Sequence, residues 1–229
     1  MHASASTSGV DALTANFSGL GVAIVFDAMF ALGLPDGVMD SQVRHLSGTP
    51  VVGRAITVNR STAARNARQS SFGADLAMGL QETIDAARPG DILVIAMGGD
   101  ASGATWGANM ATRAASLGAL AVVTDGAVRD IAEMPQIGIS VYAQRASPKV
   151  NFQHVVTLST GEPIMCGGVL VTPGDIIVAD QDGVIVVPQD RAEEVAQRAH
   201  AMHATEQTMQ EAIRNGSNLV DAIRTYKIR

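Results

Sequence analysis

Two stretches of the sequence combine residues that could bind a metal ion or a small anion. The first is Arg129-Asp130, which ends the segment VTDGAVRD that begins at Val123. Arginine offers a planar guanidinium that pairs with a carboxylate or a keto oxygen, and aspartate offers a hard oxygen ligand for Mg²⁺ or Mn²⁺. A local ion pair on a surface turn would need the same two residues, so spacing alone leaves both interpretations open.

The second stretch is the glycine-rich segment GATWGANM, which runs from Gly103 to Met110. We expect it to lead from a strand into a helix, whose first N–H groups and positive dipole end attract a carboxylate or a phosphate. Gly107 would let such a ligand approach the backbone closely. The segment is neither a P-loop nor a GxGxxG motif. A loop that needs glycine only for its shape would have the same composition.

Four further polar residues and the cysteine are weaker candidates. His200, His203 and Glu206 recur every three residues, so they drift around a helix and are not expected to bind a metal by themselves. Asp27 interrupts an apolar run and is expected either to cap a helix or to line a pocket. Cys166 has no second cysteine to pair with, and we expect a small buried apolar residue rather than a nucleophile.

The first half of the chain predicts the elements that would position these residues. Helical and strand patterns alternate, which favours βαβ packing. The expected helices cover residues 10–34 in two pieces, 75–87, and 105–116 with Thr105 as its N-cap; the expected strands cover 51–58, 91–97 and 119–124. Arg129 and Asp130 would then lie just beyond the carboxyl end of a strand, where open α/β sheets bind ligands.

The second half predicts short strands followed by one long helix. The strands are expected near residues 139–142, 155–158, 168–171, 176–179 and 184–187, and the helix over 191–214. Glycine-containing turns separate the strands, and no low-complexity linker divides the chain. We therefore predict one domain over residues 1–229, with a frayed end at residues 1–8 and a projecting helical extension over 191–229.

Composition excludes several classes of protein. Apolar residues make up 47% of the 229 residues and charged residues 17%, which suits a compact α/β protein and argues against disorder. The net charge is −6 and only two lysines occur, so nucleic-acid binding has no support. The single cysteine fits a reducing compartment. Without a basic signal-peptide region or a membrane-length apolar run, the sequence predicts a cytoplasmic protein.

Six motifs in one order resemble a known family. The chain is similar to the class II pyruvate aldolases, which include 4-hydroxy-4-methyl-2-oxoglutarate aldolase and 4-carboxy-4-hydroxy-2-oxoadipate aldolase, and to the wider superfamily of the regulator of ribonuclease activity A. The motifs are FDAMFALG (26–33), VVGRAITV (51–58), RPGDILVI (88–95), ATWGANMATRAASLG (104–118), VTDGAVRD (123–130) and GGVLVTPGDIIVADQDGVIVVP (167–188). Together they span nearly the whole chain.

The resemblance implies a fold, an assembly and a site. The fold would be an α/β/β sandwich of the swivelling phosphohistidine-domain type with a projecting C-terminal helix, assembled as a homotrimer or homohexamer with sites between subunits. Arg129 would bind the keto acid and act in catalysis, while Asp130 would hold Mg²⁺ or Mn²⁺. The backbone at residues 107–110 (Gly107, Ala108, Asn109 and Met110) would bind the substrate carboxylate. Glu206 would be a catalytic acid that reaches a neighbouring subunit's metal site.

The resemblance also implies an activity, with one departure from the family pattern. The expected enzyme is a metal-dependent lyase that cleaves a C–C bond in a small 2-keto acid and releases pyruvate, by retro-aldol cleavage or by oxaloacetate decarboxylation. Aldolases of the family carry an acidic residue where this chain has Ala108, which puts the aldol reaction in doubt. Two alternatives stay open: an isomerase, dehydratase or lyase acting on another chelating acid, and a non-enzymatic regulator of an RNA-degrading enzyme.

Overall fold

The computed structural model describes residues 12–62, 78–150 and 155–227. Within these ranges the chain forms a nine-stranded mixed sheet and a separate two-stranded hairpin. Four strands of the large sheet run parallel in the order β6-β5-β3-β2, and the others extend it or pair at its ends. The strands are β1 (Arg44–Ser47), β2 (Val51–Ser61), β3 (Asp91–Ala96), β4 (Ala104–Trp106), β5 (Ala121–Val128), β6 (Ser140–Ala146), β7 (Val156–Thr160), β8 (Ile164–Cys166), β9 (Val169–Val171), β10 (Ile176–Ala179) and β11 (Val184–Val187).

The central strands are apolar on both faces because both faces are covered. Every residue of β3 and β5 is buried, as expected for parallel strands that lie between two layers. Side chains alternate between the faces of a strand. Ile92, Val94 and Ala96 pack in one core cluster, while Leu93 and Ile95 pack in another.

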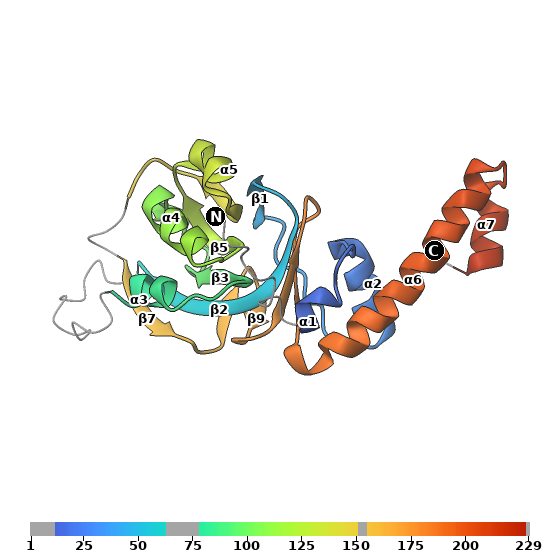
Figure 1. The fold of residues 1–229 in the computed structure, drawn as a ribbon, viewed down its shortest axis with the longest axis horizontal. Coiled ribbons are helices and arrows are strands. Elements are labelled where there is room, and N and C mark those ends of the chain that lie inside the picture. The colour runs from blue at the N-terminus through green and yellow to red at the C-terminus, as the bar shows by residue number, and fades with distance from the viewer. Residues whose placement is uncertain (1–11, 63–77, 151–154, 228–229) are drawn as a thin grey trace, which may run out of the picture.

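Helices cover one face and the β8-β9 hairpin covers the other. The helical layer contains α3 (Gly79–Asp85), α4 (Ala108–Ser116) and α5 (Met134–Ile137) (Figure 1). On the opposite face, Ile164, Cys166 and Val171 of the hairpin pack against the sheet. The three layers are helices, large sheet and hairpin, so the predicted α/β/β sandwich is confirmed.

A third cluster joins the two ends of the chain. α1 (Ala12–Ala15), α2 (Val22–Ala31) and the first half of α6 (Ala192–Arg214) pack on β10 and β11. The rest of α6 projects away from the sheet and ends beside α7 (Leu219–Tyr226), as Figure 1 shows. The projecting helix is confirmed; it ends at Arg214, and α7 is a second helix within the helical extension predicted over 191–229.

Three local predictions made from the sequence are wrong. Thr105 lies within β4, and Gly107 is the residue before α4, because the chain pairs with β5 for three residues before the helix begins. Asp27 lies in the middle of α2 on its exposed side and caps nothing; Gly21 precedes that helix. The strand expected to end at Thr124 continues to Val128.

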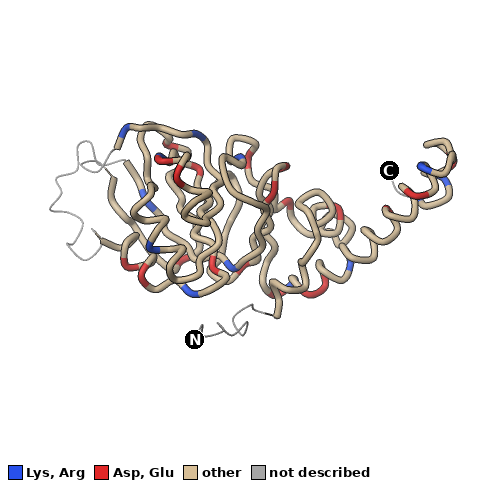
Figure 2. Tube along the Cα trace, turned by 45° about the horizontal axis from the view of Figure 1, so that its top comes forward, with Lys and Arg blue, Asp and Glu red and all other residues tan. Residues whose placement is uncertain are grey.

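Other expected features fall partly outside the described residues. The frayed segment 1–8 and the first residues of the helix expected over 75–87 lie there. Within the described ranges, no helix is long and apolar enough to cross a membrane. Acidic and basic residues are interspersed along the described trace (Figure 2).

Candidate functional site

The first six residues of the segment VTDGAVRD lie in β5, which has an irregularity there, and only Arg129 and Asp130 lie beyond the strand. The pairing of β5 with β6 shifts register between Thr124 and Ala127. Asp125, only 6% exposed, accepts hydrogen bonds from the backbone N–H groups of Met97 (2.5 Å) and Gly99 (3.0 Å). Its carboxylate therefore holds the loop after β3 against β5.

Arg129 and Asp130 follow directly after β5 and pair with each other. Arg129 Nε lies 3.3 Å from Asp130 Oδ2, and about a third of each side chain is exposed. The backbone of Asp130 is left-handed, with φ 59° and ψ 33°, a conformation that aspartate tolerates better than most residues. Because non-glycine residues seldom adopt it, this turn marks a position where the surrounding structure fixes an unusual backbone.

The start of α4 contacts the same carboxylate. The N–H of Ala108 donates to Asp130 Oδ2 over 3.0 Å, while the N–H groups of Asn109 and Met110 have no acceptor among the described residues. Free N–H groups at a helix start carry partial positive charge and bind anions. The structure thus brings the predicted residues of this stretch, Gly107 to Met110, to the same place as Arg129 and Asp130.

Gly107 leaves the space that this arrangement needs. A Cβ built on Gly107 would lie 2.8 Å from Asp130 Oδ2 and 3.0 Å from Arg129 Nε. Its φ of −165° is ordinary extended backbone, so the requirement for glycine here is steric. A side chain at this position would displace the Arg129–Asp130 pair.

A small cavity of about 80 Å³ lies beside this cluster. Its described lining contains two arginines and no carboxylate: Arg60, Ala104, Thr105, Trp106, Gly107, Asn109, Met110, Arg129, Val150 and Val155. The lining is therefore suited to an anionic group rather than to a cation.

Arg60 is a residue of this cavity that the sequence patterns did not single out. It lies on β2, is 9% exposed, and donates from Nη1 to Thr105 Oγ1 over 2.6 Å. Burial lowers the pKa of Arg60 to about 10, which still leaves it charged at neutral pH. The available signal was weak: Arg60 lies two residues after the buried Val58 on the same strand.

Glu206, His200 and His203 are not brought to this cluster within the chain. They lie on α6, and Figure 1 shows α4 and the projecting part of α6 on opposite sides of the molecule. His200 Nε2 contacts the carbonyl of Asn16 at 2.8 Å, and His203 contacts Gln207. In the part of the chain that the structure describes, no group of three His, Cys, Asp or Glu side chains could hold a metal ion.

Asp100 and Cys166 make contacts with other parts of the chain. Asp100 accepts hydrogen bonds from the Thr62 hydroxyl and from the N–H of Ser102. Cys166 is fully buried, as predicted, and burial raises the pKa of its thiol well above the usual range. A buried protonated thiol is a poor nucleophile.

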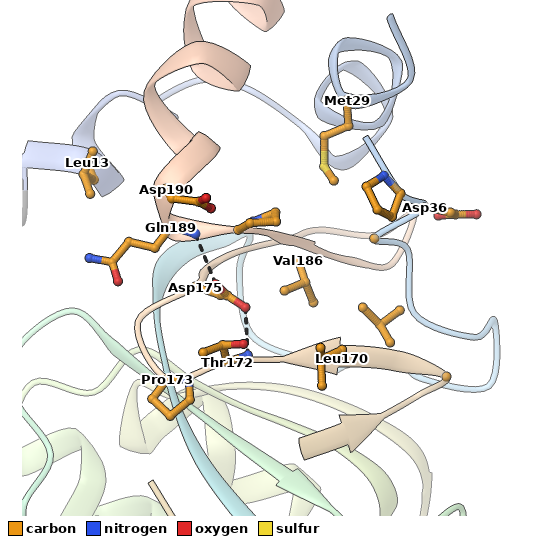
Figure 3. A pocket seen from close by; sticks show the side chains of 15 residues that line it. Leu13, Met29, Asp36, Leu170, Thr172, Pro173, Asp175, Val186, Gln189 and Asp190 are labelled. Carbon is orange, nitrogen blue, oxygen red and sulfur yellow. Dashed lines mark hydrogen bonds between the residues drawn. The ribbon is translucent and has the colours of Figure 1, made fainter. Parts of the chain in front are cut away.

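A larger cavity of about 740 Å³ lies elsewhere, between α2 and the β8-β9 hairpin. Figure 3 shows Asp175 at its centre, accepting hydrogen bonds from the N–H groups of Thr172 (2.8 Å) and Gln189 (3.1 Å). Burial raises the pKa of Asp175. None of the site residues predicted from the sequence lines this cavity.

The fold, with Arg129 and Asp130 lying at the start of α4, fits the family that the six sequence motifs resemble. Comparison of the sequence with family models gives the same family. The chain belongs to the RraA-like family, whose model, described as Aldolase/RraA, matches residues 22–186. The resemblance stated from the six motifs is therefore confirmed.

Particular relatives carry aldolase names. A putative 4-hydroxy-4-methyl-2-oxoglutarate aldolase from Halalkalibacterium halodurans is 37% identical over 144 residues, which is 61% of this chain and 65% of that protein. The 4-hydroxy-4-methyl-2-oxoglutarate aldolase of Thermus thermophilus is 35% identical over 103 residues, or 44% of this chain and 60% of that protein. The chain thus spans less than two thirds of the length of these relatives.

Solved structures match over more of the chain. An uncharacterized protein from Pseudomonas syringae pv. tomato has a TM-score of 0.82 at 26% identity, covering 99% of this chain and all of that one. RraAS2 of Streptomyces coelicolor, described as an unusual member of the RNase ES inhibitor RraA family, has a TM-score of 0.77 at 24% identity, covering 89% and 99%. The second likeness shows the fold alone.

Proposed function

We propose that this protein is a divalent-metal-dependent lyase that cleaves a C–C bond in a small 2-keto acid and releases pyruvate. One observation carries the proposal: the Asp130 carboxylate, the Arg129 guanidinium and the start of α4 meet around Gly107, beside a small cavity. The aldolase names of the relatives support the same class of reaction.

The residues present fit Mg²⁺ or Mn²⁺. Asp130 Oδ2 accepts from Ala108, while no hydrogen bond from the described residues reaches Oδ1. Magnesium keeps several waters and binds proteins through one or two carboxylates, so a single partly exposed aspartate is a sufficient protein ligand. A metal bound there would act as a Lewis acid toward the keto oxygen.

The chain's own residues would orient the substrate and stabilise developing charge. The free N–H groups of Asn109 and Met110 would bind the substrate carboxylate at the start of α4. Arg129 would donate to the keto oxygen, where negative charge grows as the C–C bond breaks. Donors already in place for that charge stabilise the transition state more than the ground state.

Ala108 determines which bond cleavage this site would perform best. Retro-aldol cleavage needs a base to remove the proton of the substrate hydroxyl, whereas decarboxylation of oxaloacetate does not. The side chain at position 108 has no acid or base, and general acid–base help is worth about 10²–10⁴-fold. We therefore expect decarboxylation of oxaloacetate to be faster than aldol cleavage. Glu206 of a neighbouring copy would be the remaining acid in a homotrimer or homohexamer.

The test compares pyruvate release by the unmodified protein and by Asp130→Ala. With Mg²⁺ or Mn²⁺, the unmodified protein should release pyruvate from oxaloacetate, and from 4-hydroxy-4-methyl-2-oxoglutarate more slowly. Both rates should fall to background in Asp130→Ala and after chelation with EDTA. A matched control is Asp85→Ala, which removes an exposed carboxylate that pairs with Arg113 at the far end of α4. Full activity in Asp130→Ala would contradict the proposal.

A second candidate function is favoured by the same alanine. Without the family's acid, the site would have more room beside Asp130, and an isomerase, dehydratase or lyase could act there on another chelating hydroxy or keto acid. Binding of oxalate with metal, but no pyruvate release from either substrate above, would favour this second candidate.

A further inference from the structure

The small cavity beside α4 contains a buried positive charge, Arg60, that no Asp or Glu of the described residues balances. Arg60 is 9% exposed, and its hydrogen-bond acceptors are neutral: Thr105 Oγ1 at 2.6 Å and the Thr105 carbonyl at 3.5 Å. Its Nε has no hydrogen-bond partner among the described residues. Across the described ranges, no Asp or Glu lies within ion-pair distance of Arg60.

Arg60 differs from two other arginines near α4, which are both paired with carboxylates. Arg129 pairs with Asp130, and Arg113 pairs with Asp85. Charged side chains are seldom buried unless they are paired, because taking a charge out of water is costly. The cost is offset when a ligand of opposite charge fills the cavity, and an Arg fork suits a carboxylate in particular.

Three further donors belong to residues that line the same cavity. Among the described residues, the buried indole N–H of Trp106 has no acceptor, and neither do the N–H groups of Asn109 and Met110 at the start of α4. Arg60 comes from β2, while these donors come from β4 and α4, so they border the space from different elements. A cavity with donors from three elements and no carboxylate is built for an anion.

We propose that this cavity is a buried carboxylate pocket, and that Arg60 is the substrate-binding residue that makes it select a charged carboxylate over a neutral group. The cavity has a volume of about 80 Å³, enough for a carboxylate group, and Gly107 and Arg129 lie on its border. The rest of the substrate would then lie toward Arg129 and Asp130. This proposal rests on the proposed function for the identity of the substrate, and it adds the residue that recognises one end of it.

The first test needs no variant. Binding to the unmodified protein is measured by calorimetry with pyruvate, with its neutral amide, and with inorganic phosphate, each with Mg²⁺ present. Pyruvate should bind about tenfold to hundredfold more tightly than the amide, since hydrogen bonds to charged groups are the stronger ones. Equal binding of pyruvate and the amide, or tighter binding of phosphate, would overturn the proposal.

The second test uses Arg60→Met and Arg60→Lys, with Arg113→Gln as the control on the exposed side of α4. Arg60→Met should raise the Kd for pyruvate about tenfold to hundredfold and leave the Kd of the amide unchanged, while Arg60→Lys should recover part of the loss. Thermal unfolding without ligand separates binding from structure. Because Arg60→Met removes an unbalanced buried charge, its melting temperature should equal or exceed that of the unmodified protein.

The two proposals fail in different ways. A pyruvate Kd that does not change in Arg60→Met overturns the carboxylate pocket, even if the protein is an active lyase. Selective, Arg60-dependent binding of pyruvate without any pyruvate release supports the pocket and contradicts the lyase. If Arg60→Met does not fold, Arg60 is structural, and only a Kd for pyruvate raised in Arg60→Lys would keep the proposal.

Discussion

At the scale of single residues, the candidate site depends on two small residues, Gly107 and Ala108. Gly107 has no Cβ, so Arg129 and Asp130 can lie directly over it. Ala108 has no carboxylate, so its contribution to the cluster is a backbone N–H donated to Asp130. The position of the Arg129–Asp130 pair therefore depends on the backbone at Gly107 and Ala108. Substitutions that add side-chain atoms at these two positions should lower ligand affinity more than they lower stability.

Gly107→Ala tests this dependence. The added Cβ would lie 2.8 Å from Asp130 Oδ2, closer than real Cβ contacts, and the carboxylate would have to move. Since φ at this position suits alanine, unfolding free energy should change by less than about 1 kcal/mol. Affinity for Mn²⁺ in the presence of oxalate should fall at least about tenfold, a loss of roughly 1.4 kcal/mol.

Isothermal titration gives the metal affinity, and urea unfolding gives the stability. A variant with unchanged metal affinity would show that Asp130 binds no metal in its present position. A variant that loses several kcal/mol of stability would show that Gly107 is needed for the fold itself.

At the scale of elements, the site is held by the connection between the ends of β3 and β5. Asp125 is buried in β5 and accepts two backbone N–H groups from the loop after β3. The loop leads to β4, and the Trp106 carbonyl of β4 accepts the N–H of Arg129. The position of Arg129 therefore depends on contacts of β5 and the residues after it with the segment that follows β3, which is far away in the sequence.

Asp125→Asn should weaken this connection. One carboxylate oxygen becomes an NH₂ group that cannot accept an N–H, and a buried donor that loses its acceptor costs about 1–3 kcal/mol. Urea unfolding should show a loss of that size. The control is Asp36→Asn, where an exposed carboxylate accepts the N–H of Val38 and water can replace it, so less than about 1 kcal/mol should be lost. Equal losses in the two variants would contradict this role for Asp125.

The elements also show which parts of the secondary structure can be predicted from sequence patterns. β10 and β11 were predicted at their observed bounds, since four consecutive apolar residues stand between turn signals in each. Ile164–Cys166 was missed because three residues give no period to detect. Thr105 was assigned to a helix cap from its type, but pairing with β5 decides its conformation. Local patterns fail where long-range pairing determines the structure.

The site was partly predictable for the same reason. Arg129 and Asp130 follow a strong apolar run, so their place at a strand end could be inferred from neighbouring residues. Arg60 could not be found in that way, because its burial depends on the contact between β2 and β4. The acceptor role of Asp125 likewise depends on a loop that lies 26 to 28 residues away.

At the scale of the whole molecule, the chain separates the two acids that the family resemblance places in one site. Asp130 lies beside α4, whereas Glu206 lies on the projecting part of α6 (Figure 1). α7 at the end of this arm exposes Leu219 (59%) and Val220 (56%), and exposed apolar residues that lie together are typical of contact surfaces. If Glu206 serves catalysis, it serves the site of another copy.

Mixing two inactive variants tests whether sites are shared. Asp130→Ala and Glu206→Gln should each lower pyruvate release in the pure state. In a ring of copies, each site would take Asp130 from one protomer and Glu206 from its neighbour. After the two variants are unfolded together and refolded at equal amounts, about a quarter of the sites should have both acids intact. Activity should return to about that fraction of the unmodified level.

Mixing Asp130→Ala with Asp130→Ala,Glu206→Gln is the control, because no site in that mixture regains Asp130, and it should stay inactive. Size-exclusion chromatography with light scattering checks that both mixtures assemble to the same mass. Since one chain cannot bring Glu206 to its own Asp130 without moving α6 off β10 and β11, recovery of activity would require the acids of two copies to act together. A mixture that stays inactive while it assembles normally would mean that Glu206 acts outside this site.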